Sequence, residues 1–196
     1  MSTAAIARPG LALSAERLRL PRGRAVLLRA IGAQDAAATQ AFVAGLSLDA
    51  RHKRFHVGLR QLSPELLRQM TEVDQHQHVA LVAQALWPLP AQPAPQLVAD
   101  ARYVRSPTHP DEAEFAIAVA DDWQSLGLGR ALMARLSGHA RAQGLRALTG
   151  DVLVENRRML VLMRGLGAGT RAHPDGPQLV RVVFELDALQ ALARAS

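Results

Sequence analysis

A carboxylate and a glycine-rich turn stand at opposite ends of one short apolar segment. Residues 115–119 have the composition of a buried β-strand, Glu114 precedes them, and Gln124-Ser125-Leu126-Gly127-Leu128-Gly129 follows. Glycines let a backbone approach an anion closely, and the free N–H groups of a helix start can bind it. The pattern predicts a pyrophosphate-binding turn, with an acid for proton transfer at the far end of the strand.

The turn runs directly into a helical pattern, which places its N–H groups at a helix N-terminus. We expect the pyrophosphate to be bound by the backbone of Leu126, Gly127, Leu128, Gly129 and Arg130, with Gln124 bracing the turn. Arg130 would add a charge-assisted contact. The plainer alternative makes Gly127 an ordinary turn residue and Gly129 a close-packing position. A dinucleotide fingerprint fits poorly, because Leu132 occupies its third glycine position.

The elements that position these residues alternate between strands and helices. Periodicity, caps and breakers predict strands at 24–30, 78–86, 96–104, 114–120, 147–154 and 179–186, and helices at 34–46, 47–51 onward, 63–73, 127–143, 156–166 and from 187. The prolines between 88 and 95 predict an exposed hairpin loop. This order favours an α/β fold with a mixed sheet.

Composition narrows the class of protein. The chain has 196 residues, 49% of them hydrophobic, which suits one globular domain. It has no cysteine, which excludes disulfides, thiolate metal sites and a cysteine nucleophile. No apolar run is long enough for a membrane span, so we expect a cytoplasmic protein without a membrane partner. We expect residues 1–22 to form a flexible arm and 23–196 a single domain.

The net charge of +6 is almost entirely arginine, since Lys53 is the only lysine. Such a balance suits a phosphate-rich cofactor or nucleic acid. Nucleic acid is the weaker reading, because aromatic residues make up only 4% of the chain and the arginines are scattered. We therefore expect no nucleic-acid partner.

With both motifs in view, the chain resembles the GNAT family of acyl-CoA-dependent N-acyltransferases. The first motif is the Gln-x-x-Gly-x-Gly turn at 124–129, and the second is a strand followed by Asn156, Met159, Leu166 and Gly167. A closer resemblance is to the acetyltransferase domain of bacterial Pat-type protein lysine acetyltransferases, through the segments 46–55, 62–67, 79–83 and 113–116.

The resemblance implies a GNAT fold, with a mostly antiparallel central sheet whose fourth and fifth strands splay apart. It implies acetyl-CoA as co-substrate and no metal. Pantetheine would lie in the gap and bond to the main chain of Ile117 and Val119, and Asn156 and Met159 would contribute to cofactor binding. For Asn156 the plainer alternative is helix N-capping, which is compatible with a ligand contact.

Glu114 is the candidate general base. An alkylammonium has a pKa near 10.4 and must lose a proton before it attacks a thioester. A carboxylate can accept that proton, directly or through water, and partial burial would raise the carboxyl pKa toward the working range. In the resembling proteins a glutamate in the same Ala-Glu-Phe-Ala context is the base. Otherwise Glu114 is a solvated charge at a strand end.

One position departs from the family. At the position of Met163, many members of the family have a tyrosine that acts as general acid for the CoA thiolate. The only tyrosine, Tyr103, is predicted on another strand. Either water protonates the thiolate or the activity is impaired. Pat-type domains often lack this tyrosine as well.

Two sets of polar residues allow more than one interpretation. The pairs His52/His56 and His76/His78 have metal-compatible spacing but no third ligand motif, so surface histidines are favoured, with His76 or His78 near the acceptor. Arg51 and Arg54 would meet an acidic acceptor or the CoA 3′-phosphate, or else form a solvated basic helix face.

The predicted function is transfer of acetyl from acetyl-CoA to an amine, with a protein lysine as the leading acceptor. A small amine or polyamine acceptor is the first alternative. A non-catalytic acyl-CoA-binding regulatory module is the second, and a homodimer is possible in either case.

Overall fold

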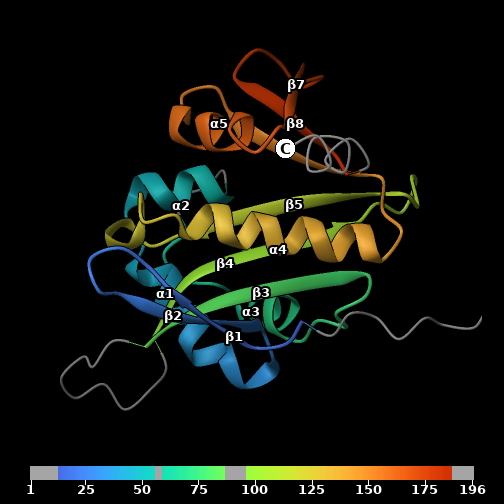
Figure 1. The fold of residues 1–196 in the computed structure, drawn as a ribbon. Coiled ribbons are helices and arrows are strands. Elements are labelled where there is room, and N and C mark those ends of the chain that lie inside the picture. Colours follow the sequence, from blue (N-terminus) through green and yellow to red (C-terminus); the bar gives the residue numbers. More distant parts are fainter. Residues whose placement is uncertain (1–12, 56–58, 87–95, 187–196) are drawn as a thin grey trace, which may run out of the picture.

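The structure is a computed structural model that describes residues 13–55, 59–86 and 96–186 (Figure 1). Its strands and helices follow one another along the chain as β1 (Glu16–Arg19), β2 (Ala25–Ala30), η1 (Ala33–Asp35), α1 (Ala36–Gly45), α2 (Leu48–Phe55), α3 (Pro64–Thr71), β3 (His78–Ala85), β4 (Leu97–Arg105), β5 (Glu112–Val119), η2 (Asp121–Trp123), α4 (Leu128–Ala142), β6 (Ala147–Leu153), α5 (Arg157–Arg164), β7 (Gly169–Ala172) and β8 (Leu179–Glu185).

The strands form one eight-stranded sheet in the order β1-β2-β3-β4-β5-β6-β8-β7. Neighbours are antiparallel except β5 and β6, which run parallel. Parallel neighbours need a crossover, and α4 supplies it. The predicted mixed α/β fold is confirmed.

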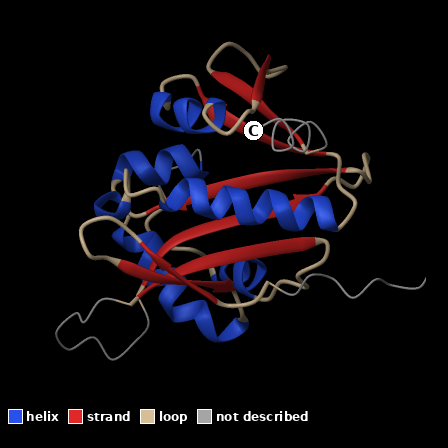
Figure 2. Cartoon of the chain, viewed as in Figure 1, coloured by secondary structure: helices blue, strands red, loops and turns tan. Residues whose placement is uncertain are grey.

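Helices cover both faces of the sheet (Figure 2). Helix α4 packs on one face through Leu128, Leu132 and Leu136, which stack one turn apart and are fully buried. On the other face, Phe42 of α1 and Met70 of α3 belong to a second core cluster. Successive side chains of each strand point to opposite faces, so the strands contribute to both cores. The sheet is therefore the rigid element that carries the site.

Local sequence signals set the helix ends. The Ser63 side chain caps α3 by accepting from the backbone N–H of Leu66, with Pro64 in the first turn. Ser47 Oγ accepts from the backbone N–H of Ala50 at the start of α2. Gly144, with φ of 79°, follows α4 in the left-handed conformation. These predicted helix boundaries are confirmed.

Two strands were not predicted. Strand β1 lies within the segment expected to be a flexible arm, yet it pairs antiparallel with β2. Strand β7 has four exposed residues and pairs with β8. The predicted proline loop at 88–95, the tail helix from 187 and the first part of the arm lie outside the described residues. Within the described ranges, no helix combines the length and the apolar composition of a membrane span.

Candidate active site

The site begins where β5 and β6 separate. Their parallel ladder consists of three residue pairs and ends at Glu114 and Thr149. Strand β5 continues to Val119 and β6 to Leu153, but beyond Glu114 each pairs only with its outer neighbour. The splay that the family resemblance implied for these strands is therefore present.

The open edge of β5 carries backbone groups without a strand partner. Ala120 donates to the carbonyl of Val98, and Glu112 accepts from the backbone N–H of Ser106, so the even-numbered residues of β5 bond toward β4. Antiparallel pairing alternates, and Ile117 and Val119 consequently direct their N–H and C=O groups toward the gap. An extended ligand with amide groups fits this edge.

The glycine turn lies at the far end of the same edge. Gly127 is the N-cap of α4 with φ of 85°, and Ser125 also has a positive φ, of 59°. Because Gly127 has no Cβ, it adopts this conformation without strain. A Cβ on Gly129 would lie 3.1 Å from Leu162 Cδ2, so Gly129 is also the close-packing position that the alternative interpretation proposed.

Polar side chains link this turn to α5. Gln124 Nε2 donates to the carbonyl of Val119 at 3.0 Å, which is the predicted bracing contact. The Gln124 side-chain oxygen in turn accepts from Arg158. Arg130 donates to the backbone carbonyl of Gly165 at 3.0 Å, and its contact with the pyrophosphate stays a prediction.

Helix α5 borders the gap on its other side. Asn156 Oδ1 accepts from the backbone N–H of Met159 at 3.2 Å, so the capping role of Asn156 is confirmed. Met163, at the family's tyrosine position, is 1% exposed and belongs to the core. A CoA-type ligand fits these surroundings, because the turn and the open edge of β5 offer N–H groups to its pyrophosphate and its amides.

Glu114 lies at the apex of the gap, and its side chain is exposed. The partial burial considered from the sequence is not found. A cleft of about 500 Å³ opens beside Glu114. It is lined by β4 and β5, by the loop 106–109, and by residues of β6, β7 and β8.

Most charges that line this cleft are already paired. Arg181 donates to both oxygens of Asp151, from Nε at 2.8 Å and from Nη2 at 3.0 Å. His173, which is buried, lies 2.9 Å from Asp151 Oδ2, and its Nδ1 accepts from the backbone N–H of Asp175. Burial acts to raise the pKa of Asp151, but the hydrogen bonds from Arg181 and His173 outweigh it, so the pKa is lowered.

The remaining carboxylates differ in availability. Glu185 pairs with Arg171 at 3.4 Å. Within the described part of the chain, Glu112 and Glu114 have no ion-pair partner within 4 Å. These two side chains, two residues apart on one face of β5, are the carboxylates that the cleft leaves for a cationic ligand.

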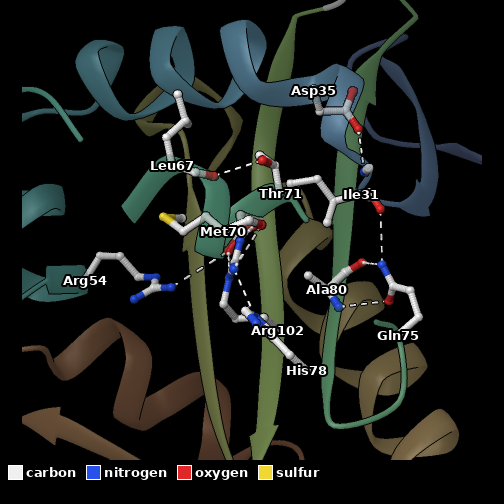
Figure 3. A network of polar contacts seen from close by, with 12 residues as sticks. Ile31, Asp35, Arg54, Leu67, Met70, Thr71, Gln75, His78, Ala80 and Arg102 are labelled. Carbon is white, nitrogen blue, oxygen red and sulfur yellow. Dashed lines mark hydrogen bonds and ion pairs between the residues drawn. The ribbon is translucent and has the colours of Figure 1, made fainter. Parts of the chain in front are cut away.

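Figure 3 shows a buried polar network around Arg102. Arg102 and Val104 pair with Ala116 and Glu114 across β4 and β5, so Arg102 lies on the face of the sheet that carries Glu114. Arg102 Nε donates to Asp100 at 2.9 Å. Arg102 Nη1 donates to the carbonyl of Met70 at 3.2 Å and lies 3.1 Å from His78 Nε2. Burial and the charge of Arg102 lower the pKa of His78. His78 thus belongs to this network and is not a solvated histidine. Sequence reasoning missed Asp100 and Arg102, because nothing in a strand pattern marks a buried ion pair.

The interpretation of Arg51 and Arg54 as a solvated basic helix face needs correction. Arg51 is 4% exposed and donates to the carbonyls of Ala44 and Leu46, at the end of α1. Arg54 is also largely buried, and it faces Asp100. Neither forms a solvated face. The zinc alternative pairs His52 with His56, and His56 lies outside the described residues.

The Tyr103 side chain lies on the opposite face of the sheet from this cleft, because its neighbour Val104 lines the cleft and side chains alternate along a strand. It is fully buried under α4, where its hydroxyl lies 3.0 Å from His139 Nδ1. Burial raises the pKa of Tyr103 to about 12. The chain's tyrosine is therefore a core hydrogen-bonding residue and does not replace the family's general acid.

A mixed sheet that opens beside a glycine turn, with a carboxylate at the apex, defines an acyltransferase-type site. The model of the acetyltransferase (GNAT) family matches residues 59–168. An acetyltransferase of Pseudomonas aeruginosa is 33% identical over 162 residues, which cover 82% of this chain and 84% of that protein. The chain belongs to the GNAT family of acetyltransferases, and the predicted family and enzyme class are confirmed.

Other similar proteins agree with the second resemblance. The acetyltransferase Pat of Mycolicibacterium smegmatis is 32% identical over 122 residues, which cover 62% of this chain and 34% of that longer protein. The GNAT domain of S. lividans PAT matches with a TM-score of 0.76 at 25% identity, over 87% of this chain and 96% of that one.

The fold also matches the spermidine N-acetyltransferase from Vibrio cholerae, solved with CoA and spermine. The TM-score is 0.63 at 17% identity, over 83% of this chain and 96% of that one.

Proposed function

We propose that this chain transfers an acetyl group from acetyl-CoA to a primary amine, and that Glu114 accepts the proton that the attacking ammonium must lose. The observation that carries the proposal is the position of Glu114. It is the last residue of β5 that pairs with β6, at the apex of the gap, and its exposed side chain lines the cleft. Acetyl-CoA supplies an activated acetyl thioester when bound.

The gap has the length and chemistry to hold this donor. Val119 lies five residues from Glu114, roughly 17 Å along an extended strand. The backbone of 126–130 would hold the pyrophosphate, and the open edge at Ile117 and Val119 would hold the pantetheine amides. The reactive end then points toward Glu114, because the turn fixes the opposite end.

Glu114 is favoured over the other carboxylates of the cleft. Asp151 already accepts from Arg181 and His173, and Glu185 pairs with Arg171, so protonating either one would break an existing pair. Glu112 also lines the cleft, but it lies two residues further from the open part of β5. This difference makes Glu112 the matched control for Glu114.

A protein lysine is the acceptor we propose. The cleft opens at the surface beside Val104, which is 46% exposed, so a partner protein could place a lysine side chain beside Glu114. The similarity to proteins named Pat supports this acceptor class. A polyamine is the second candidate, because Glu112 and Glu114 together offer two negative charges to a ligand with two ammonium groups.

The experiment measures CoA release from acetyl-CoA with a lysine-containing protein and with spermidine as acceptors, using wild type, Glu114→Gln and Glu112→Gln. We expect Glu114→Gln to lower kcat by about 100-fold or more, in the range of general base catalysis, while acetyl-CoA binds as in wild type. Glu112→Gln should keep kcat with a lysine acceptor.

Three outcomes would contradict parts of this proposal. If Glu114→Gln keeps the wild-type kcat, Glu114 is not the general base. Turnover with spermidine alone would replace the lysine by a polyamine. Binding of acetyl-CoA without turnover on any acceptor would favour the regulatory module.

A further inference from the structure

The cleft beside Glu114 separates its available charges by strand. On β5 it is lined by two glutamates without an ion-pair partner among the described residues, and on β7 and β8 by Arg171 and Arg181. Thr149 pairs with Glu114 on one side and with Val183 on the other, so neutral side chains lie between the two groups. The cleft is therefore bipolar, with carboxylates at one end and guanidinium groups at the other.

Arg181 is held in a fixed orientation. Its Nε and Nη2 donate to the two oxygens of Asp151 on β6, and the buried His173 lies 2.9 Å from the same carboxylate. These contacts leave Nη1 without a hydrogen bond among the described residues, and the Arg181 side chain is 39% exposed. A guanidinium has five N–H donors in a planar fork, so its outer part remains for an oxygen of a ligand.

Arg171 stands directly opposite Arg181. The two residues pair across the antiparallel β7–β8 ladder, and both line the cleft. Like charges directly opposite one another on a sheet are destabilising, which favours an anion between them. Arg171 contacts Glu185 at 3.4 Å, but both side chains are more than half exposed, so this pair is weak and open to exchange. Arg105, the other arginine of the cleft, lies on β4 and donates to three backbone carbonyls.

The separation of the two ends suits a peptide. Arg181 lies two strands from Glu114 and two residues along β8 from Val183, which pairs with Thr149. Strands about 4.8 Å apart, with a rise of about 3.3 Å per residue, place the two Cα atoms roughly 12 Å apart. An extended peptide advances about 3.3–3.6 Å per residue. A lysine and an acidic residue two or three positions away therefore span this distance with their side chains.

We propose that this cleft selects acceptors that carry a carboxylate beside the reactive amine, and that Arg171 and Arg181 bind that carboxylate. The inference rests on the proposed function, because it takes the amine to lie at Glu114. It names the acceptor more closely, as a protein lysine with an acidic residue two or three positions away. A polyamine has only cationic groups, which the two arginines repel. A free amino acid shares the combination of amine and carboxylate, and the experiment separates the two sources.

The test uses two N-acetylated peptides with a single lysine and either glutamate or glutamine at the second and third positions on both sides of it. Free lysine and spermidine are the other acceptors. CoA release gives kcat/KM, and fluorescence anisotropy of the labelled peptides with CoA present gives Kd. We expect wild type to favour the glutamate peptide by about threefold to tenfold in both measurements, in the range of an exposed ion pair with a guanidinium. The preference should shrink at about 1 M salt, where the Debye length is about 3 Å.

Variants of the two arginines assign the effect. Arg171→Gln removes an exposed cation and should reduce the preference to less than about twofold. Arg171→Glu reverses the charge and should raise kcat/KM for spermidine by about threefold or more while lowering it for the glutamate peptide. Arg181→Lys keeps a charge beside Asp151 but removes the fork, and should also reduce the preference. Thermal melting checks that each variant is folded.

The matched control is Arg146→Gln. Arg146 is also an exposed arginine, 70% exposed and paired with Asp111, but it does not line the cleft. This variant should keep the wild-type preference between the two peptides. A loss of preference in Arg146→Gln equal to that in Arg171→Gln would reduce the effect to the net charge of the protein and overturn the inference.

The remaining outcomes separate this inference from the proposed function. Equal kcat/KM and equal Kd for the two peptides would overturn the inference and leave transfer to an amine intact. A preference for free lysine over both peptides, lost in Arg171→Gln, would support the carboxylate site and overturn the protein acceptor. If the peptides bind with the expected preference but no acceptor is acetylated, the carboxylate site stands and the proposed function fails.

Discussion

Glu114 and Thr149 form the last pair of the parallel β5–β6 ladder, so the carboxylate lies at the apex of the gap between these strands. Residues before this pair hold the two strands together, and residues after it leave the β5 edge open. One position in the sequence therefore sets both the depth of the gap and the location of its acid.

Gly127 and Gly144 allow a controlled test of the glycine turn. Both have positive φ, of 85° and 79°, no atom lies within 4 Å of an added Cβ at either, and they flank α4 at opposite ends. Alanine at either site should cost about 1–2 kcal/mol of unfolding free energy through backbone strain. Only Gly127→Ala should also weaken acetyl-CoA binding by calorimetry. Equal affinities for the two variants would contradict the pyrophosphate role.

Asn156 allows capping and ligand binding to be separated. Asn156→Ala removes the acceptor for the Met159 N–H and should cost about 1 kcal/mol, whereas Asn156→Asp keeps a capping oxygen. If the Asn156 amide N–H also contacts pantetheine, Asn156→Asp should keep its thermal stability and lose acetyl-CoA affinity. Wild-type affinity in Asn156→Asp would restrict this residue to capping.

Tyr103 should be dispensable for chemistry. Tyr103→Phe removes a buried hydroxyl that lies 3.0 Å from His139, and the loss should cost about 1 kcal/mol of stability. Because the hydroxyl is covered by α4, we expect kcat at 25 °C to match that of wild type. Chemical denaturation and steady-state kinetics measure both effects. A large drop in kcat at unchanged stability would identify Tyr103 as the proton donor.

Asp35 should make stability depend on acid pH. Burial acts to raise the pKa of Asp35, but hydrogen bonds from Arg29, at 2.7 Å, and from the Gly32 N–H outweigh it, so the pKa is lowered. A lowered folded-state pKa stabilises the fold above the unfolded-state value of about 3.9. That contribution is lost as the pH falls below about 4 and through the folded-state pKa.

The variant Asp35→Asn isolates this contribution. It should lower the unfolding free energy at pH 7 by roughly 1–3 kcal/mol and flatten the decline of stability below about pH 4. Asp49→Asn is the matched control, because Asp49 pairs with Lys53 with its side chain 68% exposed, and it should change little. An unchanged acid limb in Asp35→Asn would show that other carboxylates dominate there.

The sequence predicted the local order of the sheet and the residues that border the gap. Ser63, Asn156 and Gly144 mark helix ends through short-range hydrogen bonds and backbone conformation, which neighbouring residues determine. The burial of the Arg102–Asp100 pair and of Arg54 depends on contacts between β4 and the helices α2 and α3, which are far from β4 in the chain. β1 and β7 escaped notice because they are four residues long and mostly exposed, which leaves no apolar alternation to read.

The short β5–β6 ladder also has a thermodynamic consequence. The sheet is continuous across its middle through three residue pairs, and a molecule that bonds to the open β5 edge would complete the missing part of the ladder. A ligand that binds the folded state but not the unfolded state raises the stability of the protein by mass action. The gain is about 2.7 kcal/mol when the ligand concentration is a hundred times the Kd. The melting temperature of this protein should therefore follow the concentration of its acyl donor, so that the supply of substrate also sets how stable the folded enzyme is.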